Sequence, residues 1–136
     1  MLSLYNTLSG KNELFKQLNG NKVNIFVCGI TPYDYAHIGH AKTYIQFDLI
    51  VKYLRFLGYD VFYLQNVTNI DDKIIERARK RNKDYLEIAS YFEEQYKDDM
   101  SSLRVNSVDK YARATDYIKE IQNQVKGLIK KENAYM

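Results

Sequence analysis

The alternation of apolar and polar positions predicts a strand, a helix and a second strand in the first half of the chain. Residues 23–27 (VNIFV) alternate with period two and contain β-branched side chains, which favours a strand that ends at Gly29. From Gly39 to Gly58, apolar residues recur mostly at three- and four-residue steps, which predicts a helix closed by a C-terminal glycine. Residues 61–67 (VFYLQNV) then predict the second strand.

A strand, a long crossover helix and a second strand form a βαβ unit, whose strands are parallel and whose handedness is right-handed. We therefore expect an α/β fold with a parallel sheet. Ligands of such sheets bind beyond the carboxyl ends of the strands. Cys28, Gly29, Thr31 and Thr68 would lie at that edge, and we expect them to converge on one pocket.

The remaining pattern predicts an extended N-terminal segment, a linker and three further helices. Residues 1–22 carry scattered apolar anchors, with turns at Ser9-Gly10 and Asn19-Gly20. Residues 101–109 carry no periodic pattern and are expected to be a linker, so that the chain contains two strands in all. The predicted helices cover residues 71–81, 84–100 and 115–133, the last of them amphipathic.

The helix predicted over residues 71–81 begins with acids and continues into a basic run. Thr68 and Asp71 have a spacing like that of a capping box, and Asp71 and Asp72 suit the positive end of a helix dipole. The basic run has two interpretations, a solvated helix face or a contact with an RNA backbone. Its basic residues are Lys73, Arg77, Arg79, Lys80, Arg81 and Lys83.

Composition narrows the class of protein. The 136 residues suffice for one domain, and 46% hydrophobic with 27% charged residues are ordinary for a globular protein. The net charge of +3 excludes a chain that is basic over its whole surface. A single cysteine excludes an internal disulfide and a complete zinc framework. The N-terminus is too polar for a signal peptide and no run approaches a membrane span, so we expect a soluble, cytoplasmic protein.

Unusual chemistry is concentrated in residues 23–48, which contain the only cysteine, the only proline and both histidines. A helix N-terminus attracts anions, and Gly39 would let a nucleotide lie close to the backbone. His37 and His40 could donate hydrogen bonds to phosphate oxygens, so the segment suits ATP. Alternatively, the histidines could be a metal pair or ordinary capping residues, and Cys28 could be a small buried hydrophobe.

Several strings match one family in order. The string His37-Ile38-Gly39-His40 resembles the HIGH signature of class I aminoacyl-tRNA synthetases, and the surrounding residues resemble cysteinyl-tRNA synthetases in particular. The resemblance extends from the first residues almost to Ala134-Tyr135. The other matching strings are LYNTL at 4–8, VCGITPYD at 27–34, RFLGY at 55–59, NVTNIDDKII at 66–75 and RAT at 113–115.

The resemblance implies a Rossmann-like class I catalytic domain that joins L-cysteine to its tRNA. Cysteine carboxylate would attack the α-phosphate of ATP, with Mg²⁺, and the cysteinyl group of the adenylate would then pass to the terminal adenosine. Cys28 would be the first ligand of one zinc ion that binds the substrate thiolate, the remaining ligands lying outside this chain. ATP would be bound by His37, Ile38, Gly39 and His40, of which the histidines would be catalytic, and the amino acid by Gly29, Thr31 and Thr68.

The resemblance also implies that residues 1–136 are the N-terminal part of a single catalytic domain. The KMSKS region and the anticodon-binding domain would lie outside them, and the complete protein would be a monomer with no membrane contact. We expect the isolated chain to bind zinc weakly and not to turn over. One departure is Asn69, where the family usually has Asp, which questions a charged role there but not the fold.

Two other classes of function remain open. A small HxGH-type adenylyltransferase also places histidines at the first helix after a strand, but it would not need Cys28 or zinc; a cysteine:amino-sugar ligase is a nearer variant that would not need tRNA. A non-catalytic nucleotide-binding fragment would bind ATP without releasing pyrophosphate.

Overall fold

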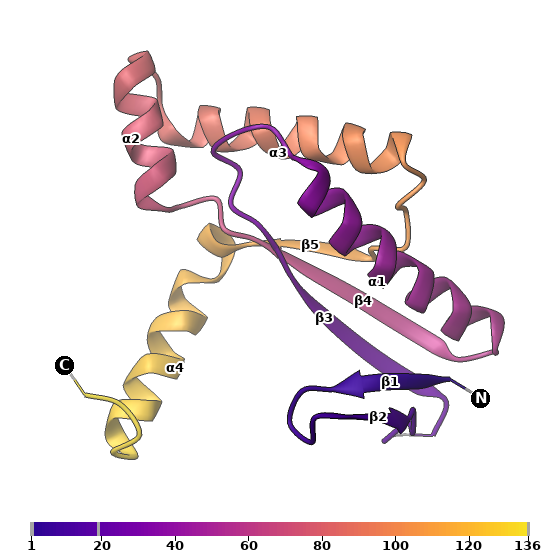
Figure 1. Ribbon diagram of the computed structural model, residues 1–136. Helices are drawn as coiled ribbons and strands as arrows, with labels where there is room; N and C mark the ends of the chain where they lie inside the picture. Colours follow the sequence, from indigo (N-terminus) through magenta and orange to yellow (C-terminus); the bar gives the residue numbers. More distant parts are fainter. Residues whose placement is uncertain (1, 19, 136) are drawn as a thin grey trace.

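The computed structural model describes residues 2–18 and 20–135, which form a three-stranded sheet, a two-stranded hairpin and four α-helices. Helices α1 and α3 lie on the same side of the larger sheet, whereas α4 extends away from it (Figure 1). In chain order the elements are β1 (Ser3–Asn6), β2 (Lys11–Leu14), β3 (Lys22–Ile30), α1 (Ile38–Phe56), β4 (Asp60–Val67), α2 (Asp72–Arg81), α3 (Tyr85–Ser102), β5 (Lys110–Arg113), the 3₁₀ turn η1 (Ala114–Tyr117) and α4 (Ile118–Lys130).

The larger sheet is parallel and has the order β3-β4-β5. Val23 of β3 is paired with Val61 of β4, and Leu64 of β4 is paired with Lys110 of β5. Helix α1 makes the crossover between β3 and β4 and ends before Gly58, whose φ of +88° is the left-handed conformation of a helix-terminating glycine. The α/β class with a parallel sheet and the predicted βαβ unit are therefore confirmed.

The expectation of two strands in all was wrong, because the larger sheet has a third strand, β5, and the N-terminal segment forms two more, β1 and β2. Its four residues, KYAR, are too short to show a strand periodicity, and the segment before it was expected to be a linker. Asp109 fixes the start of the pairing: its carboxylate accepts the Tyr63 N–H at 2.7 Å, and its own N–H donates to the Tyr63 carbonyl at 2.9 Å. The strand thus depends on a long-range contact rather than on a local pattern.

The N-terminal segment is a β-hairpin rather than a merely extended chain. Ser3 of β1 is paired with Leu14 of β2, antiparallel. The predicted turn at Ser9-Gly10 is confirmed, and Gly10 has a φ of +67° that favours glycine. In the second predicted turn, Gly20 lies in a turn and Asn19 lies outside the described residues.

Buried tyrosines and a glutamine form a polar network in the main core. Gln65, which is 1% exposed, donates to the Tyr63 hydroxyl at 2.5 Å and accepts from the Tyr96 hydroxyl at 3.0 Å. Tyr96 also meets Tyr44 edge to face, with ring centroids 5.4 Å apart. Burial raises the pKa of Tyr44 to about 12. These side chains join α1, α3 and β4 while keeping their polar atoms paired.

Helices α2 and α3 pack against each other through a second hydrophobic cluster. We define this pair as the α2–α3 hairpin. Each helix is capped by the aspartate before it: Asp71 accepts the Lys73 N–H at 2.9 Å, and Asp84 accepts the Leu86 N–H at 2.8 Å. The cluster consists of Ile74, Ala78, Ile88, Ala89 and Phe92.

The expected capping box between Thr68 and Asp71 was wrong. Asp71 is itself the N-cap, with an extended backbone, while the Thr68 hydroxyl accepts a hydrogen bond from Asn66 at 3.2 Å. The placement of Asp71 as a helix-start acid is confirmed.

Two buried carboxylates fasten the later elements to the core. Asp48 of α1 accepts the N–H groups of Asn106 and Ser107, both at 2.9 Å, and so holds the segment that leads to β5. Glu93 of α3, 2% exposed, binds Arg113 at the end of β5 through both Nε at 2.8 Å and Nη2 at 3.2 Å. These contacts place the carboxyl end of β5 beside α3.

The last predicted helix is confirmed, with η1 as its first turn and α4 as its body. One face of α4 is apolar yet exposed, consisting of Ile118, Ile121, Val125 and Leu128, each 40–47% exposed. Among residues 2–18 and 20–135, no helix is both long and apolar enough to cross a membrane.

Candidate functional site

The carboxyl end of β3 contains an irregularity that only glycine permits. The register of β3 against β4 shifts between Val27 and Ile30. At Gly29 the strands approach so closely that an added Cβ would lie 1.8 Å from the carbonyl oxygen of Asn66. The obstructing atoms are backbone, so the clash could not be relieved by rotating a side chain.

Asn66 joins the two strand ends at this point. Its Oδ1 accepts the Gly29 N–H at 2.8 Å, and its Nδ2 donates to the Thr68 hydroxyl at 3.2 Å. The Thr68 N–H donates to the carbonyl of Ile30 at 2.9 Å, which places Thr68 beside the start of the loop that contains Thr31. The structure therefore brings Gly29 and Thr68 together, with half-buried Thr31 adjacent to them in sequence.

The role of Asn66 was not predicted from the sequence. Its only signal is an asparagine at the end of an otherwise apolar or β-branched strand, where asparagine is disfavoured. The contact it makes with Gly29 spans 37 residues and could not be inferred from local spacing.

Cys28 is exposed and has a free thiol. The alternative of a buried small hydrophobe is thus wrong. Its carbonyl accepts a hydrogen bond from the Tyr44 hydroxyl at 3.3 Å, which anchors the residue to α1 through its backbone and leaves the side chain uninvolved. In the part of the chain that the structure describes, no group of three His, Cys, Asp or Glu side chains could hold a metal ion. Cys28 can therefore provide one soft sulfur donor of the kind zinc prefers, but not a complete site.

The two histidines form a capping box at the start of α1. Nδ1 of His37 accepts the N–H of Gly39, and Nδ1 of His40 accepts the N–H of His37, both at 3.1 Å. The rings are stacked with centroids 4.0 Å apart. A Cβ on Gly39 would lie 2.9 Å from Cε1 of His37, so the missing side chain makes room for this ring.

These hydrogen bonds decide which nitrogen atoms of the two histidine rings can still bind a ligand. A backbone N–H can only donate, so both Nδ1 atoms are acceptors and the protons are on Nε2. Burial, followed by the neighbouring His37, lowers the pKa of His40. Each ring thus has an Nε2–H that these contacts leave as a donor, while the N–H of Gly39 is already engaged.

The basic run of α2 is partly neutralised by acids. Lys80 pairs with Glu76 at 2.8 Å and Arg77 pairs with Asp34 at 2.6 Å, while Lys83 also binds Glu87. The interpretation as a solvated helix face is confirmed for Lys80, which is 72% exposed. Contact of the run with RNA stays a prediction.

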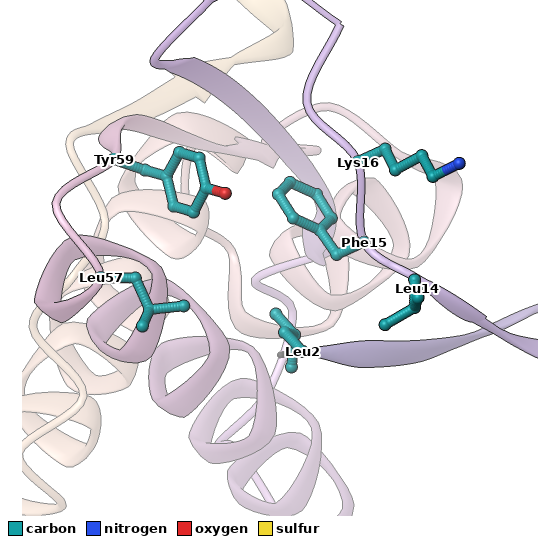
Figure 2. Close-up of a pocket in the computed structure, with 6 residues that line it drawn as sticks. All are labelled: Leu2, Leu14, Phe15, Lys16, Leu57 and Tyr59. Carbon is teal, nitrogen blue, oxygen red and sulfur yellow. The ribbon is translucent and has the colours of Figure 1, made fainter.

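An apolar cavity lies away from these residues. It has a volume of about 420 Å³ and lies between the N-terminal hairpin and the loop that joins α1 to β4 (Figure 2). That loop precedes β4, so the cavity is at the amino edge of the sheet, opposite the candidate site. Its walls are formed by Leu2, Leu14, Phe15, Lys16, Leu57 and Tyr59.

Comparison with known proteins agrees with this geometry. Residues 14–136 match the family described as tRNA synthetases class I (C) catalytic domain. The chain belongs to this family. It is 49% identical to a cysteine–tRNA ligase of Thermoplasma acidophilum over 98% of its own length and 30% of the relative's. Similar matches are cysteine–tRNA ligases of Aeropyrum pernix (45% identical, 100% of this chain, 29% of the relative) and Pseudomonas syringae pv. syringae (44%, 99% and 29%).

The chain spans about 30% of the length of the curated relatives it matches. The resemblance to cysteinyl-tRNA synthetases is confirmed, and with it the class I synthetase fold for this part of the sequence.

Asn69, the departure from the family pattern, has a structural role. It is 5% exposed, its Nδ2 donates to the Thr115 hydroxyl at 2.8 Å, and its Oδ1 accepts the Thr115 N–H at 3.1 Å. Both ends of the amide are therefore used to join the loop after β4 to η1.

Proposed function

We propose that the protein to which these residues belong ligates L-cysteine to its tRNA through a cysteinyl-adenylate intermediate. In this proposal residues 1–136 are the N-terminal part of one catalytic domain, and the KMSKS region and anticodon-binding domain lie outside them. The extent of the match, about 30% of each relative, supports this division. The complete protein would be a cytoplasmic monomer.

The observation that carries the proposal is the histidine pair at the start of α1. Both Nε2–H groups remain donors, and they stand at the positive end of a 19-residue helix. Donors fixed in this way can hold the phosphates of ATP and stabilise the negative charge that grows when cysteine carboxylate attacks the α-phosphate. His37, Ile38, Gly39 and His40 are the proposed ATP-binding residues, and the two histidines are the proposed catalytic ones.

Catalysis would depend on positioning and charge stabilisation. Cysteine carboxylate forms a bond to the α-phosphorus as pyrophosphate leaves with the electron pair of the broken bond, and no protein nucleophile is needed. In the second step the ribose hydroxyl of the terminal adenosine attacks the acyl carbon and AMP leaves. The family resemblance implies Mg²⁺ bound with ATP.

Cys28 is the proposed first ligand of a zinc ion. Its exposed, free thiol at the carboxyl end of β3 suits that role, and the other ligands would come from outside this chain. Bound zinc would supply selectivity for the thiolate of cysteine over the hydroxyl of serine. Gly29, Thr31 and Thr68 would border the amino acid, next to the ends of β3 and β4.

The experiment is transfer of labelled cysteine to tRNA by the complete protein. Cysteine esterified to the tRNA terminal adenosine is the expected product. Activation of cysteine without transfer to tRNA, but with transfer to an amino sugar, would favour the sibling ligase instead. ATP binding with no cysteine-dependent step would favour an adenylyltransferase or a non-catalytic protein.

The isolated chain is a separate case. The exposed apolar face of α4 and the single thiol donor suggest that this chain alone binds zinc weakly and does not complete adenylate formation. A rate of adenylate formation equal to that of the complete protein would contradict this expectation.

A further inference from the structure

The loop of residues 31–36, which connects the Cys28 end of β3 to the histidine pair, is held by the α2–α3 hairpin. Asp34 accepts two hydrogen bonds from Arg77 of α2, from Nη1 at 2.6 Å and Nη2 at 3.0 Å. This two-point contact fixes orientation as well as distance. The Arg77 and Asp34 side chains are 25% and 45% exposed, so the pair lies at the border of the protein interior.

The residues on either side of Asp34 contact the same hairpin. The hydroxyls of Tyr35 and Tyr91 share a hydrogen bond of 2.9 Å, and the Tyr35 ring meets Phe92 edge to face with centroids 5.2 Å apart. Lys73 of α2 places its ammonium 5.2 Å from the centroid of the Tyr33 ring. Three consecutive side chains of the loop are thus bound to α2 or α3.

Arg77, which holds Asp34, is itself fixed by its packing against the hairpin. The guanidinium of Arg77 lies over the ring of Phe92, 4.8 Å from its centroid, and Phe92 is 1% exposed within the hydrophobic cluster of the hairpin. Pro32, at the start of the loop, is also fully buried. The loop is therefore held by the α2–α3 hairpin through residues 33–35, while Ala36 packs against the main core.

We infer that Asp34 and Arg77 are positioning residues, which set where the histidine pair stands relative to the strand end that carries Cys28. The inference rests on the proposed ATP-binding role of the histidines. We call the two-point contact between Asp34 and Arg77 the clamp. If it is broken, the loop can shift and carry the N-cap His37 with it. A misplacement of about 1 Å at a reacting group can lower the reaction rate about 100-fold, so even a small shift of the loop would affect the site.

The test measures the dissociation constant of ATP by equilibrium dialysis on the complete protein and its Asp34→Asn and Arg77→Met variants. We expect each variant to bind ATP about 10- to 100-fold more weakly, which is the effect of losing about one hydrogen bond to a charged phosphate group. The double variant should be no weaker than the weaker single variant, because both changes remove the same interaction. Arg77→Lys keeps the charge but loses the two-point contact, so it should recover part of the affinity.

The control is the Glu76–Lys80 pair on the same helix, an exposed ion pair that is bonded to neither Asp34 nor Arg77 in the described structure. Glu76→Gln and Lys80→Met should leave the ATP dissociation constant unchanged. A clamp with only a structural role would lower the number of sites per protein as less of it folds, without changing the dissociation constant. That result, or equal weakening by the control variants, would overturn the inference.

Failure of the proposed function can be distinguished from failure of this inference, because each has its own measurement. Cysteine-stimulated exchange of pyrophosphate into ATP, measured on the unmodified protein, tests cysteine activation. The ATP dissociation constants of the variants test the clamp whether or not cysteine is the substrate.

Discussion

The two glycines at positions 29 and 127 allow a matched test of the strand junction. In Gly29→Ala the new Cβ would lie 1.8 Å from the Asn66 carbonyl oxygen and 3.0 Å from its carbon. To reach even the closest contact of real Cβ atoms, 3.0 Å, the strands must separate by about 1.2 Å. The same movement would stretch the 2.8 Å hydrogen bond from Gly29 to Asn66.

The cost follows from these two effects. Overpacking of a close contact costs about 1–3 kcal/mol. A weakened hydrogen bond that leaves a partly buried N–H without a partner adds about 1 kcal/mol. We therefore expect Gly29→Ala to lower the free energy of unfolding by about 2–4 kcal/mol, a large share of the total stability of a small domain.

Urea unfolding followed by circular dichroism measures this change, with Gly127→Ala as the control. Gly127 lies within α4 and an added Cβ meets nothing within 4 Å, so alanine there should stabilise the helix by about 0.5–1 kcal/mol. An unfolding free energy of Gly29→Ala within about 0.5 kcal/mol of the parent would refute the claimed close approach.

Three further predictions concern the capping residue and the buried carboxylates. His37→Ala should destabilise the protein by about 1 kcal/mol through loss of the N-cap, whereas His37→Asn should restore stability but not ATP affinity; recovery of both in His37→Asn would exclude a role for Nε2. Arg113→Met should lower the free energy of unfolding in urea by about 1–3 kcal/mol, because it removes two hydrogen bonds from buried Glu93; no change would mean that Lys97, whose ammonium also donates to Glu93 at 2.5 Å, is a sufficient partner. Burial raises the pKa of Asp48, but the ion pair with Lys52 and the hydrogen bonds from the backbone N–H groups of Asn106 and Ser107 outweigh it and lower the pKa overall. The contribution of Asp48 to folding stability is therefore present above the pKa of a carboxyl in the unfolded chain, and it is lost as the pH falls through the lowered pKa of the folded state. Asp48→Asn should flatten the acid limb of a curve of stability against pH. An unaltered acid limb would contradict this prediction.

The βαβ unit could be predicted because its signals are local. The strand alternation at residues 23–27, the helical spacing after Gly39 and the terminating glycine at position 58 are each visible within one element. The parallel pairing of the two predicted strands and the position of the ligand edge at their carboxyl ends followed from general rules of chain connection. The candidate residues Cys28, Gly29 and Thr68 were placed at the strand ends for the same reason.

The missed features depend on contacts between distant residues. Strand β5 is set by Asp109 against Tyr63, 46 residues apart, and its own four residues carry no pattern. The role of Asn66 requires knowing that Gly29 lies opposite it. Asp71 rather than Thr68 caps α2 because the helix begins at Asp72, which leaves Thr68 three residues before the N-cap position.

The histidines show how two interpretations can both hold. The sequence left open whether His37 and His40 cap the helix or serve ATP. Capping uses Nδ1 of each ring, which leaves each Nε2–H available for the proposed role. Local spacing could not separate these atoms, because the choice depends on the backbone conformation of His37.

The most direct test of the account is cysteine-stimulated ATP–pyrophosphate exchange by the complete protein, compared between the parent and Cys28→Ala in the presence of zinc. We expect exchange that cysteine stimulates and serine does not, and we expect this exchange to be lost in Cys28→Ala while ATP binding is kept. Exchange by the parent that is independent of cysteine, or undiminished exchange in Cys28→Ala, would contradict the proposed roles of this chain.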